Sequence, residues 1–237
     1  IAWNLVTWYF GVPSSSSYAL IGGLVGAALV AGGTKAVLWN GVLFKVLIPM
    51  IVSPFVGCGI AWCLMKLLLR ISKKDRPIYK YFQLASSAAV ALTHGLNDAQ
   101  KSMGIITLGL FSAGLIASHH IPLWVIGACA LFMALGTASG GFRIIRTMGY
   151  EITHLKPIDG FGAELSSSIV MLTASLFGMP LSSTHIIVGS ITGVGSARGA
   201  ERVRWTTAHK VALAWTFTLP GAALVSAALF SILKLWI

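Results

Sequence analysis

Four polar or charged residues stand close together in a sequence that is otherwise strongly apolar. They lie in the stretch Thr93–Gly104, and no Asp, Glu, Lys or Arg occurs between Tyr81 and Leu96 before them. A charged side chain at bilayer depth costs about 2.5–3.5 kcal/mol on insertion scales and usually marks a substrate or ion pathway. A membrane helix can unwind at glycine and turn its backbone toward a ligand, and we expect this at Gly95 and Gly104. The four residues that the stretch places near a binding site are Asn97, Asp98, Gln100 and Lys101.

Hydroxyl side chains follow a helix-breaking proline at two other places. Ser15, Ser16 and Ser17 come after Pro13, and Ser182, Ser183 and Thr184 come after Pro180. Proline removes a backbone donor and ends a helix, so a new helix is predicted to begin at each hydroxyl cluster. Free N–H groups and hydroxyls at a helix N-terminus favour negative charge. Each cluster is therefore a candidate oxyanion site.

The acidic residue of the first stretch adds a second ion to this picture. Asp98 beside an anion would repel it unless a cation or proton lies between them. The sequence therefore predicts coupled binding of an anion and a cation, with Asp98 as the coupling residue. Glu164, a lone acid at the edge of an uncharged run, and His185 are the other candidates for that role.

Composition decides which elements must position these groups. The chain is 56% hydrophobic and 10% charged, against about 25% charged residues in soluble domains. It is predicted to be an all-α, multi-pass protein of the lipid bilayer. The net charge of +11 does not indicate a nucleic-acid partner, because the basic residues lie in loops between apolar runs. No resident cofactor or metal site is predicted. The adjacent His119 and His120 are interpreted as a turn at the membrane interface.

The two hydroxyl clusters lie in uncharged runs of unusual length. Residues 1–34 and 165–197 carry no charge, whereas one membrane span needs about 20 residues and two need about 40. A broken or re-entrant helix explains both lengths, provided that protein or a water-filled cavity surrounds the break. Clean spans are predicted at 46–65, 123–141 and 211–233.

The same two runs repeat one another. Phe-Gly-Val-Pro-Ser-Ser-Ser-Ser-Tyr at 10–18 matches Phe-Gly-Met-Pro-Leu-Ser-Ser-Thr-His at 177–185, and Trp39 and Pro54 continue the register as Trp205 and Pro220. The loop after the first copy is poor in basic residues and the loop after the second is rich in them. Positive-inside bias puts these loops on opposite faces of the membrane. We therefore expect an inverted repeat of the kind found in secondary transporters, with residues 1–70 in the first repeat, a basic cytoplasmic loop at 71–80 and the second repeat at 81–237.

These motifs carry a family resemblance. Gly-Leu-Asn-Asp-Ala-Gln-Lys-Ser-Met-Gly at 95–104, together with Gly-Met-Pro-Leu-Ser-Ser-Thr-His at 178–185, resembles the inorganic phosphate transporter (Pit) family, in particular its bacterial low-affinity members. The resemblance implies secondary transport of inorganic phosphate across the plasma (inner) membrane. It implies co-transport of H⁺ or Na⁺, with phosphate carried alone or as a complex with a divalent cation. The residues implied for phosphate are Asn97, Asp98, Ser15, Ser16, Ser17, Ser182, Ser183 and Thr184.

The sequence departs from the family pattern in two respects. The family usually has Thr-His in both hairpins, whereas the first hairpin here has Ser17-Tyr18. A second Asn-Asp motif, expected in the first repeat, does not occur before Phe10, and the sequence is interpreted as lacking the helices that carry it.

Other functions stay open at this point. A permease for sulfate or another oxyanion would use the same scaffold. A membrane-embedded hydrolase would use His185 as base with Asp98 as its partner, but the duplicated hairpin argues against an enzyme. The coupling ion, and assembly into a homo-oligomer, are not decided by the sequence.

Overall fold

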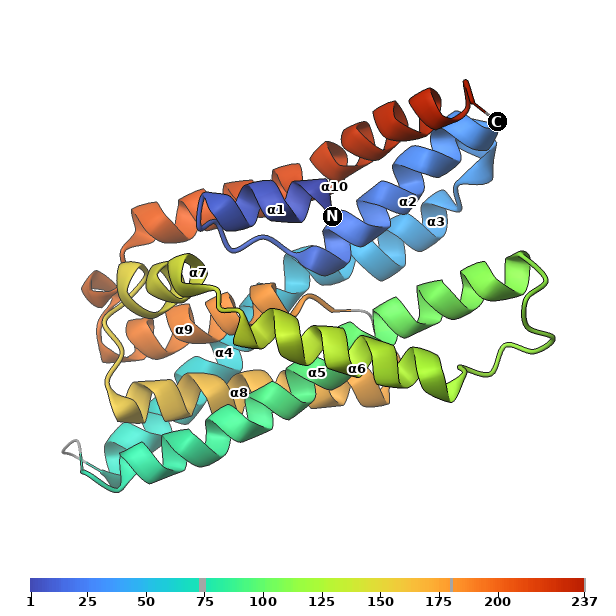
Figure 1. Cartoon of the computed structure of the whole chain (residues 1–237). Helices are drawn as coiled ribbons and strands as arrows, with labels where there is room; N and C mark the ends of the chain where they lie inside the picture. Colours follow the sequence, from blue (N-terminus) through green and yellow to red (C-terminus); the bar gives the residue numbers. More distant parts are fainter. Residues whose placement is uncertain (73–75, 180, 237) are drawn as a thin grey trace.

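The chain folds into a bundle of helices that lie side by side, described by a computed structural model for residues 1–72, 76–179 and 181–236 (Figure 1). No strand occurs in these ranges. The helices are α1 (Ala2–Tyr9), α2 (Ser16–Gly32), η1 (Thr34–Ala36), α3 (Trp39–Val42), η2 (Leu43–Leu47), α4 (Ile48–Ile71), α5 (Tyr79–Ser112), α6 (Leu123–Ala138), α7 (Phe142–Arg146), η3 (Thr147–Glu151), α8 (Pro157–Leu176), α9 (Ser183–Arg198), η4 (Ala200–Arg202) and α10 (Trp205–Leu233).

Large apolar side chains cover the outside of the bundle. Phe55 of α4, Phe132 of α6 and Leu224 of α10 are each more than 70% exposed. Two continuous helical segments, Trp39–Ile71 and Trp205–Leu233, are long and apolar enough to cross a membrane. The pair α6 and α7–η3, bent by 63°, forms a third candidate span. An apolar surface of this extent marks contact with lipid or with other proteins, and together with these spans it shows a multi-pass membrane protein, as predicted.

Helix α5 differs from the sequence expectation. It runs without a break for 34 residues, so the predicted unwinding at Gly95 and Gly104 is wrong. A side chain added at either glycine would meet no other atom within 4 Å, so no close approach requires them. An unbroken helix satisfies its own backbone groups, which lipid cannot do. The backbone that unwinds near the polar stretch belongs instead to the segment between α8 and α9.

The repeat predicted from the sequence is present as two matching helical hairpins. The first hairpin is α1 and α2 with the link 10–15, and the second is α8 and α9 with the link 177–182, in which Pro180 lies outside the described residues. Both links turn at a glycine with positive φ, 68° at Gly11 and 63° at Gly178. Chain direction reverses in each hairpin (Figure 1).

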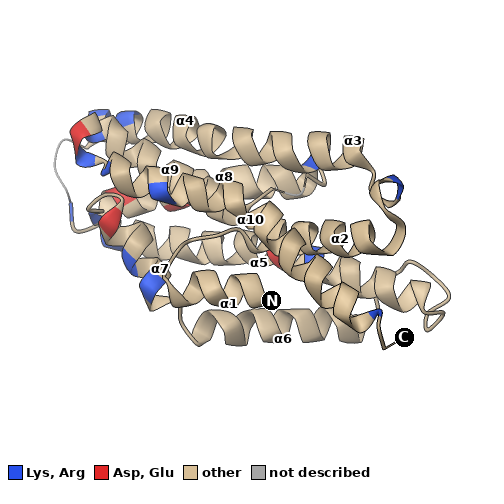
Figure 2. Cartoon of the chain, turned by 90° about the horizontal axis from the view of Figure 1, so that it is seen from above, with Lys and Arg blue, Asp and Glu red and all other residues tan. Residues whose placement is uncertain are grey.

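The two hairpins point in opposite directions. In Figure 1, α2 runs toward the end of the bundle where the C-terminus lies, and α9 runs toward the opposite end. The loops that follow them therefore lie at opposite ends, as an inverted repeat requires. Figure 2 shows most Lys and Arg residues at the end reached by α9. That the basic end faces the cytoplasm stays a prediction from positive-inside bias.

Each hairpin packs on a helix of the other repeat. Helix α2 lies along α10, and α9 lies along α4. Glycines make both contacts possible, because a side chain at Gly26 would overlap the backbone of Ala223 and one at Gly193 would overlap the backbone of Cys58. The two repeats are thus interlocked rather than adjacent.

The predicted domain boundaries are not tested by these contacts. The basic loop is shorter than expected, since α4 continues to Ile71 and α5 begins at Tyr79. Residues 73–75, which carry Lys73, Lys74 and Asp75, lie outside the described part of the chain.

Candidate functional site

One face of α5 carries the polar groups of the site. His94, Asn97, Asp98 and Lys101 are spaced i, i+3, i+4 and i+7, which places them on the same side of a helix. This side faces the link between α8 and α9, because the amide of Asn97 donates to the carbonyl of Leu181 at 3.2 Å. Gln100 is exposed. A continuous helix therefore presents the charged groups, and the broken hairpin brings its backbone to them.

Asp98 is largely buried and is surrounded by donors. Its side chain is 12% exposed. His94 Nε2 lies 2.8 Å from Oδ2, and the Ser183 hydroxyl donates to the same oxygen at 2.9 Å. The amide of Asn97 donates to Oδ1 at 3.1 Å. Charge-assisted hydrogen bonds of this kind compensate the cost of removing a carboxylate from water. The structure thus brings Asn97, Asp98 and Ser183 together, and their binding of phosphate stays a prediction.

Lys101 joins all the parts of the site. Its Nζ lies 3.1 Å from Asp98 Oδ1, and it donates to the Ser17 hydroxyl at 2.8 Å and to the Leu181 carbonyl at 2.6 Å. Ser17 belongs to the first hairpin and Leu181 to the second. One ammonium therefore holds both hairpins against α5.

The tips of the two hairpins also touch one another directly. The Thr184 hydroxyl donates to the carbonyl of Ser14 at 3.2 Å, and the Ser14 hydroxyl lies 2.7 Å from that of Thr7. A pocket of about 160 Å³ opens next to the start of α2, with Asp98 and Lys101 in its wall. Liquid water occupies about 30 Å³ per molecule, so the pocket has room for an oxyanion of a few atoms. Its wall is formed by Ile1, Asn4, Ser16, Ser17, Leu20, Asp98, Lys101 and Ser102.

Two of the predicted serines are used as helix caps. The Ser15 hydroxyl accepts from the N–H of Tyr18 at 3.3 Å, and the Ser182 hydroxyl accepts from the N–H of His185 at 3.4 Å. Both side chains are 1% exposed. Capping satisfies one of the orphan N–H groups at each helix start. That Ser15 and Ser182 contact an anion themselves stays a prediction.

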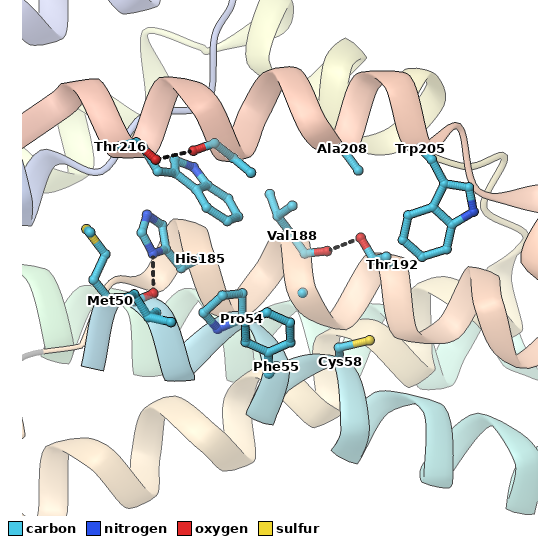
Figure 3. A pocket seen from close by; sticks show the side chains of 14 residues that line it. Met50, Pro54, Phe55, Cys58, His185, Val188, Thr192, Trp205, Ala208 and Thr216 are labelled. Carbon is cyan, nitrogen blue, oxygen red and sulfur yellow. Dashed lines mark hydrogen bonds between the residues drawn. The ribbon is translucent and has the colours of Figure 1, made fainter. Parts of the chain in front are cut away.

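His185 turns away from Asp98 into a second, apolar pocket. Its ring stacks on Trp215 with 3.9 Å between ring centres, and Nδ1 lies 3.2 Å from the carbonyl of Met50. Figure 3 shows this ring at the edge of a pocket of about 400 Å³ between α4, α9 and α10, lined by Pro54, Phe55 and other apolar residues. Its equivalent in the first hairpin, Tyr18, lies next to it at 5.1 Å between ring centres.

The hydrolase alternative requires a pairing of His185 with Asp98, and the structure does not contain this pairing. Asp98 does have a histidine partner, but that partner is His94. The role of His185 as a coupling residue stays a prediction that no contact with Asp98 supports.

Glu164 lies apart from the site. It accepts a hydrogen bond from Ser86 at 2.5 Å, and Ser86 precedes Asp98 by twelve residues on α5. At 1.5 Å per residue this separates the two acids by about 18 Å along the bundle. A direct exchange of an ion between Glu164 and Asp98 has no geometric support.

Sequence reasoning missed His94 and undervalued Lys101. The signal was present, since both are placed one helical turn from Asp98, at i−4 and i+3. The contacts of Lys101 with Ser17 and Leu181 could not be found this way, because both partners are at least 80 residues away in sequence.

Comparison with known proteins gives matches along most of the chain. The sequence profile of the phosphate transporter family matches residues 1–78 and 70–226. A probable low-affinity inorganic phosphate transporter of Rhizobium meliloti (strain 1021) is 45% identical over 96% of this chain and 70% of its own length. Proteins of the same description from Mycobacterium tuberculosis (strain ATCC 25618 / H37Rv) and Bacillus subtilis (strain 168) are 44% and 41% identical, and the chain spans 56% and 72% of their lengths.

The fold agrees as well. A solved structure described as the sodium-dependent phosphate transporter superposes with a TM-score of 0.83 and 26% identity, over 99% of this chain and 77% of that one. The relatives are described as transporters or permeases and not as enzymes. The interlocked hairpins, the polar site between them and these matches lead to one assignment: the chain belongs to the phosphate transporter family.

Proposed function

We propose that the protein containing this chain carries inorganic phosphate across the membrane by secondary transport, with a co-transported cation as the driving ion. The observation that carries the proposal is the meeting of two equivalent hairpin tips at a charged cluster on α5, beside a polar pocket. In inverted-repeat transporters the substrate lies near the bilayer midplane, where half-helix N-termini point at anionic groups.

Charge and hydrogen-bonding capacity support an oxyanion. The starts of α2 and α9 supply N–H groups and positive dipole ends, and Ser16 of α2 adds a hydroxyl to the pocket wall. Lys101 adds a full positive charge, which Asp98 balances. A tetrahedral anion that can both accept and donate hydrogen bonds, such as hydrogen phosphate, suits both the N–H groups and the carboxylate. A fully ionised sulfate has no proton to donate to Asp98, so phosphate is favoured over the sulfate alternative.

The identity of the driving ion, H⁺ or Na⁺, and carriage of phosphate as a complex with a divalent cation belong to the same proposal. Asp98 is the candidate for coupling because it is the acid that borders the pocket. A metal–phosphate complex would bring its own positive charge to this carboxylate.

Ser183→Ala in the full-length protein tests the proposal. The Ser183 hydroxyl lies 2.9 Å from the Asp98 carboxylate and is proposed to bond the phosphate as well, and a hydrogen bond to a charged ligand contributes about 1.5–3 kcal/mol. We expect phosphate affinity, measured as uptake of labelled phosphate into proteoliposomes, to fall roughly tenfold or more. Thr173→Ala is the matched control, because that hydroxyl is bonded to the carbonyl of Ile169 in its own helix.

Competition experiments distinguish phosphate from sulfate and from a metal–phosphate complex as the transported species. An excess of unlabelled phosphate should suppress uptake and an excess of sulfate should not. Removal of divalent cations by a chelator should stop uptake only if a metal–phosphate complex is carried. Equal phosphate affinity in the Ser183 and Thr173 variants, or stronger competition by sulfate, would contradict the assignment.

A further inference from the structure

The ammonium of Lys101 stands in a position that is built like a cation site. Its three neighbours are a carboxylate oxygen of Asp98, a hydroxyl of Ser17 and the carbonyl of Leu181, at 2.6–3.1 Å. Leu181 lies in the unwound link between α8 and α9. Unwound backbone carbonyls of this kind coordinate Na⁺ in transporters with broken helices. Oxygen atoms from three separate segments therefore converge on one point, and a lysine side chain reaches it.

The Lys101 ammonium also satisfies all of its hydrogen-bond donors at this position. A lysine ammonium has three N–H donors and no acceptor, and here it has three oxygen partners. Its side chain is 15% exposed and that of Asp98 is 12% exposed. A second cation bound to the same oxygens would lie a few ångströms from the Lys101 ammonium and would be repelled by it. The Lys101 side chain cannot move out of the way without leaving the buried Asp98 carboxylate unpaired. Such unpaired burial is strongly unfavourable.

We propose that Lys101 is a tethered cation that takes the place of a sodium ion beside Asp98, so that phosphate transport by this protein does not need sodium. The proposal rests on the proposed phosphate transport and specifies its ion requirement. It also explains how an acid can border an anion pocket: the positive charge that shields the anion from Asp98 is part of the chain. The solved structure with a similar fold is described as sodium-dependent, and the ion requirement of this protein is predicted to differ from it.

The first test is uptake of labelled phosphate into proteoliposomes that contain the full-length protein, under an inward proton gradient, with either sodium or choline as the external cation. The wild-type protein should show the same initial rate in both media. Lys101→Ala should lose uptake in choline and regain it in sodium, with a ratio of about tenfold or more between the media. Lys66→Ala, which removes an exposed lysine over the Trp62 ring, should behave as the wild type.

A second test does not need transport. The melting temperature of the purified protein is measured with sodium and with choline, in the absence of phosphate. Sodium should raise it in Lys101→Ala, because a ligand that binds the folded state stabilises it, and should leave the wild type unchanged.

The outcomes separate this proposal from the one on which it rests. A sodium requirement in the wild type overturns the role of Lys101, and so does a Lys101→Ala protein whose melting temperature does not respond to sodium. If the wild type moves no phosphate in either medium, the proposed transport fails, and the melting measurements still decide whether Lys101 occupies a sodium position.

Discussion

Gly193→Ala is a sharp test of the interlocked architecture. Gly193 of α9 faces the backbone of Cys58 in α4, and an added Cβ would overlap the Cys58 carbonyl oxygen. It would also lie 2.9 Å from the carbonyl carbon and Cα, where ordinary contact begins at 3.4 Å. The obstacle is backbone on both sides, so no side-chain rotation relieves it. The carbonyl oxygen is the nearest atom, so the two helices must move apart by about 1 Å at their closest point.

The expected cost follows from this geometry. Overpacking a well-packed contact costs about 1–3 kcal/mol, and a backbone obstacle belongs at the upper end. Replacing a helical glycine by alanine stabilises the helix by about 1 kcal/mol through its higher helix propensity. The net loss of about 2 kcal/mol corresponds to a fall in Tm of about 4–8 °C for a chain of this size.

The assay is thermal unfolding of the purified full-length protein in detergent, with Gly59→Ala as the matched control. Gly59 lies on the same helix as Cys58, but a side chain there would meet nothing within 4 Å, so its Tm should rise by about 2–4 °C. Gly26→Ala, the equivalent change in the other repeat, should reproduce the loss. An unchanged or raised Tm for Gly193→Ala would refute the close packing of α4 on α9.

Two further changes have definite outcomes. Asp98→Asn leaves the Lys101 ammonium without its carboxylate, so phosphate should still bind but should not be concentrated inside proteoliposomes; a variant that accumulates phosphate against a gradient would remove Asp98 from the coupling role. Asp159→Asn breaks a buried ion pair with Arg198, in which the charged atoms are 2.5 Å apart. This change should cost about 3 kcal/mol of stability or more and lower Tm by about 6–12 °C. Glu151→Gln removes an exposed pair with Arg146 and should change Tm by less than about 4 °C. Equal Tm values for these two variants would contradict the buried character of the first pair.

The sequence was sufficient for the architecture because the relevant signals are local. The helix breaks follow from a glycine–proline–serine motif. The membrane spans follow from the length of uninterrupted apolar sequence, and the inverted orientation of the repeats follows from the charge of two loops. Each can be read within a window of a few tens of residues, and the structure confirms the broken hairpins and their opposite directions.

The details of the site were less accessible because they depend on contacts between distant segments. The continuity of α5 was mispredicted from Gly95 and Gly104, since glycine permits unwinding but does not require it. The pairing of α2 with α10 could not be inferred from either helix alone. Lys101 was recognised as a neighbour of the site, yet its position between the two hairpins depends on oxygens of Ser17 and Leu181 that no spacing rule connects.

The exchange of helices between repeats has a consequence for how the protein is made. The face of α2 that contains Gly22 is covered by Leu219 of α10, a residue that the ribosome adds almost 200 positions later. At about 5–20 residues per second, translation of the intervening chain takes about 10–40 s. During that time the small-residue face of α2 lacks its partner helix, and it must be occupied by lipid, by the insertion machinery or by a passing helix. Release of the nascent chain from the translocon is therefore expected to wait for α10, and a truncation just before Trp205 should leave the earlier helices open to quality-control proteases although every one of them has been synthesised.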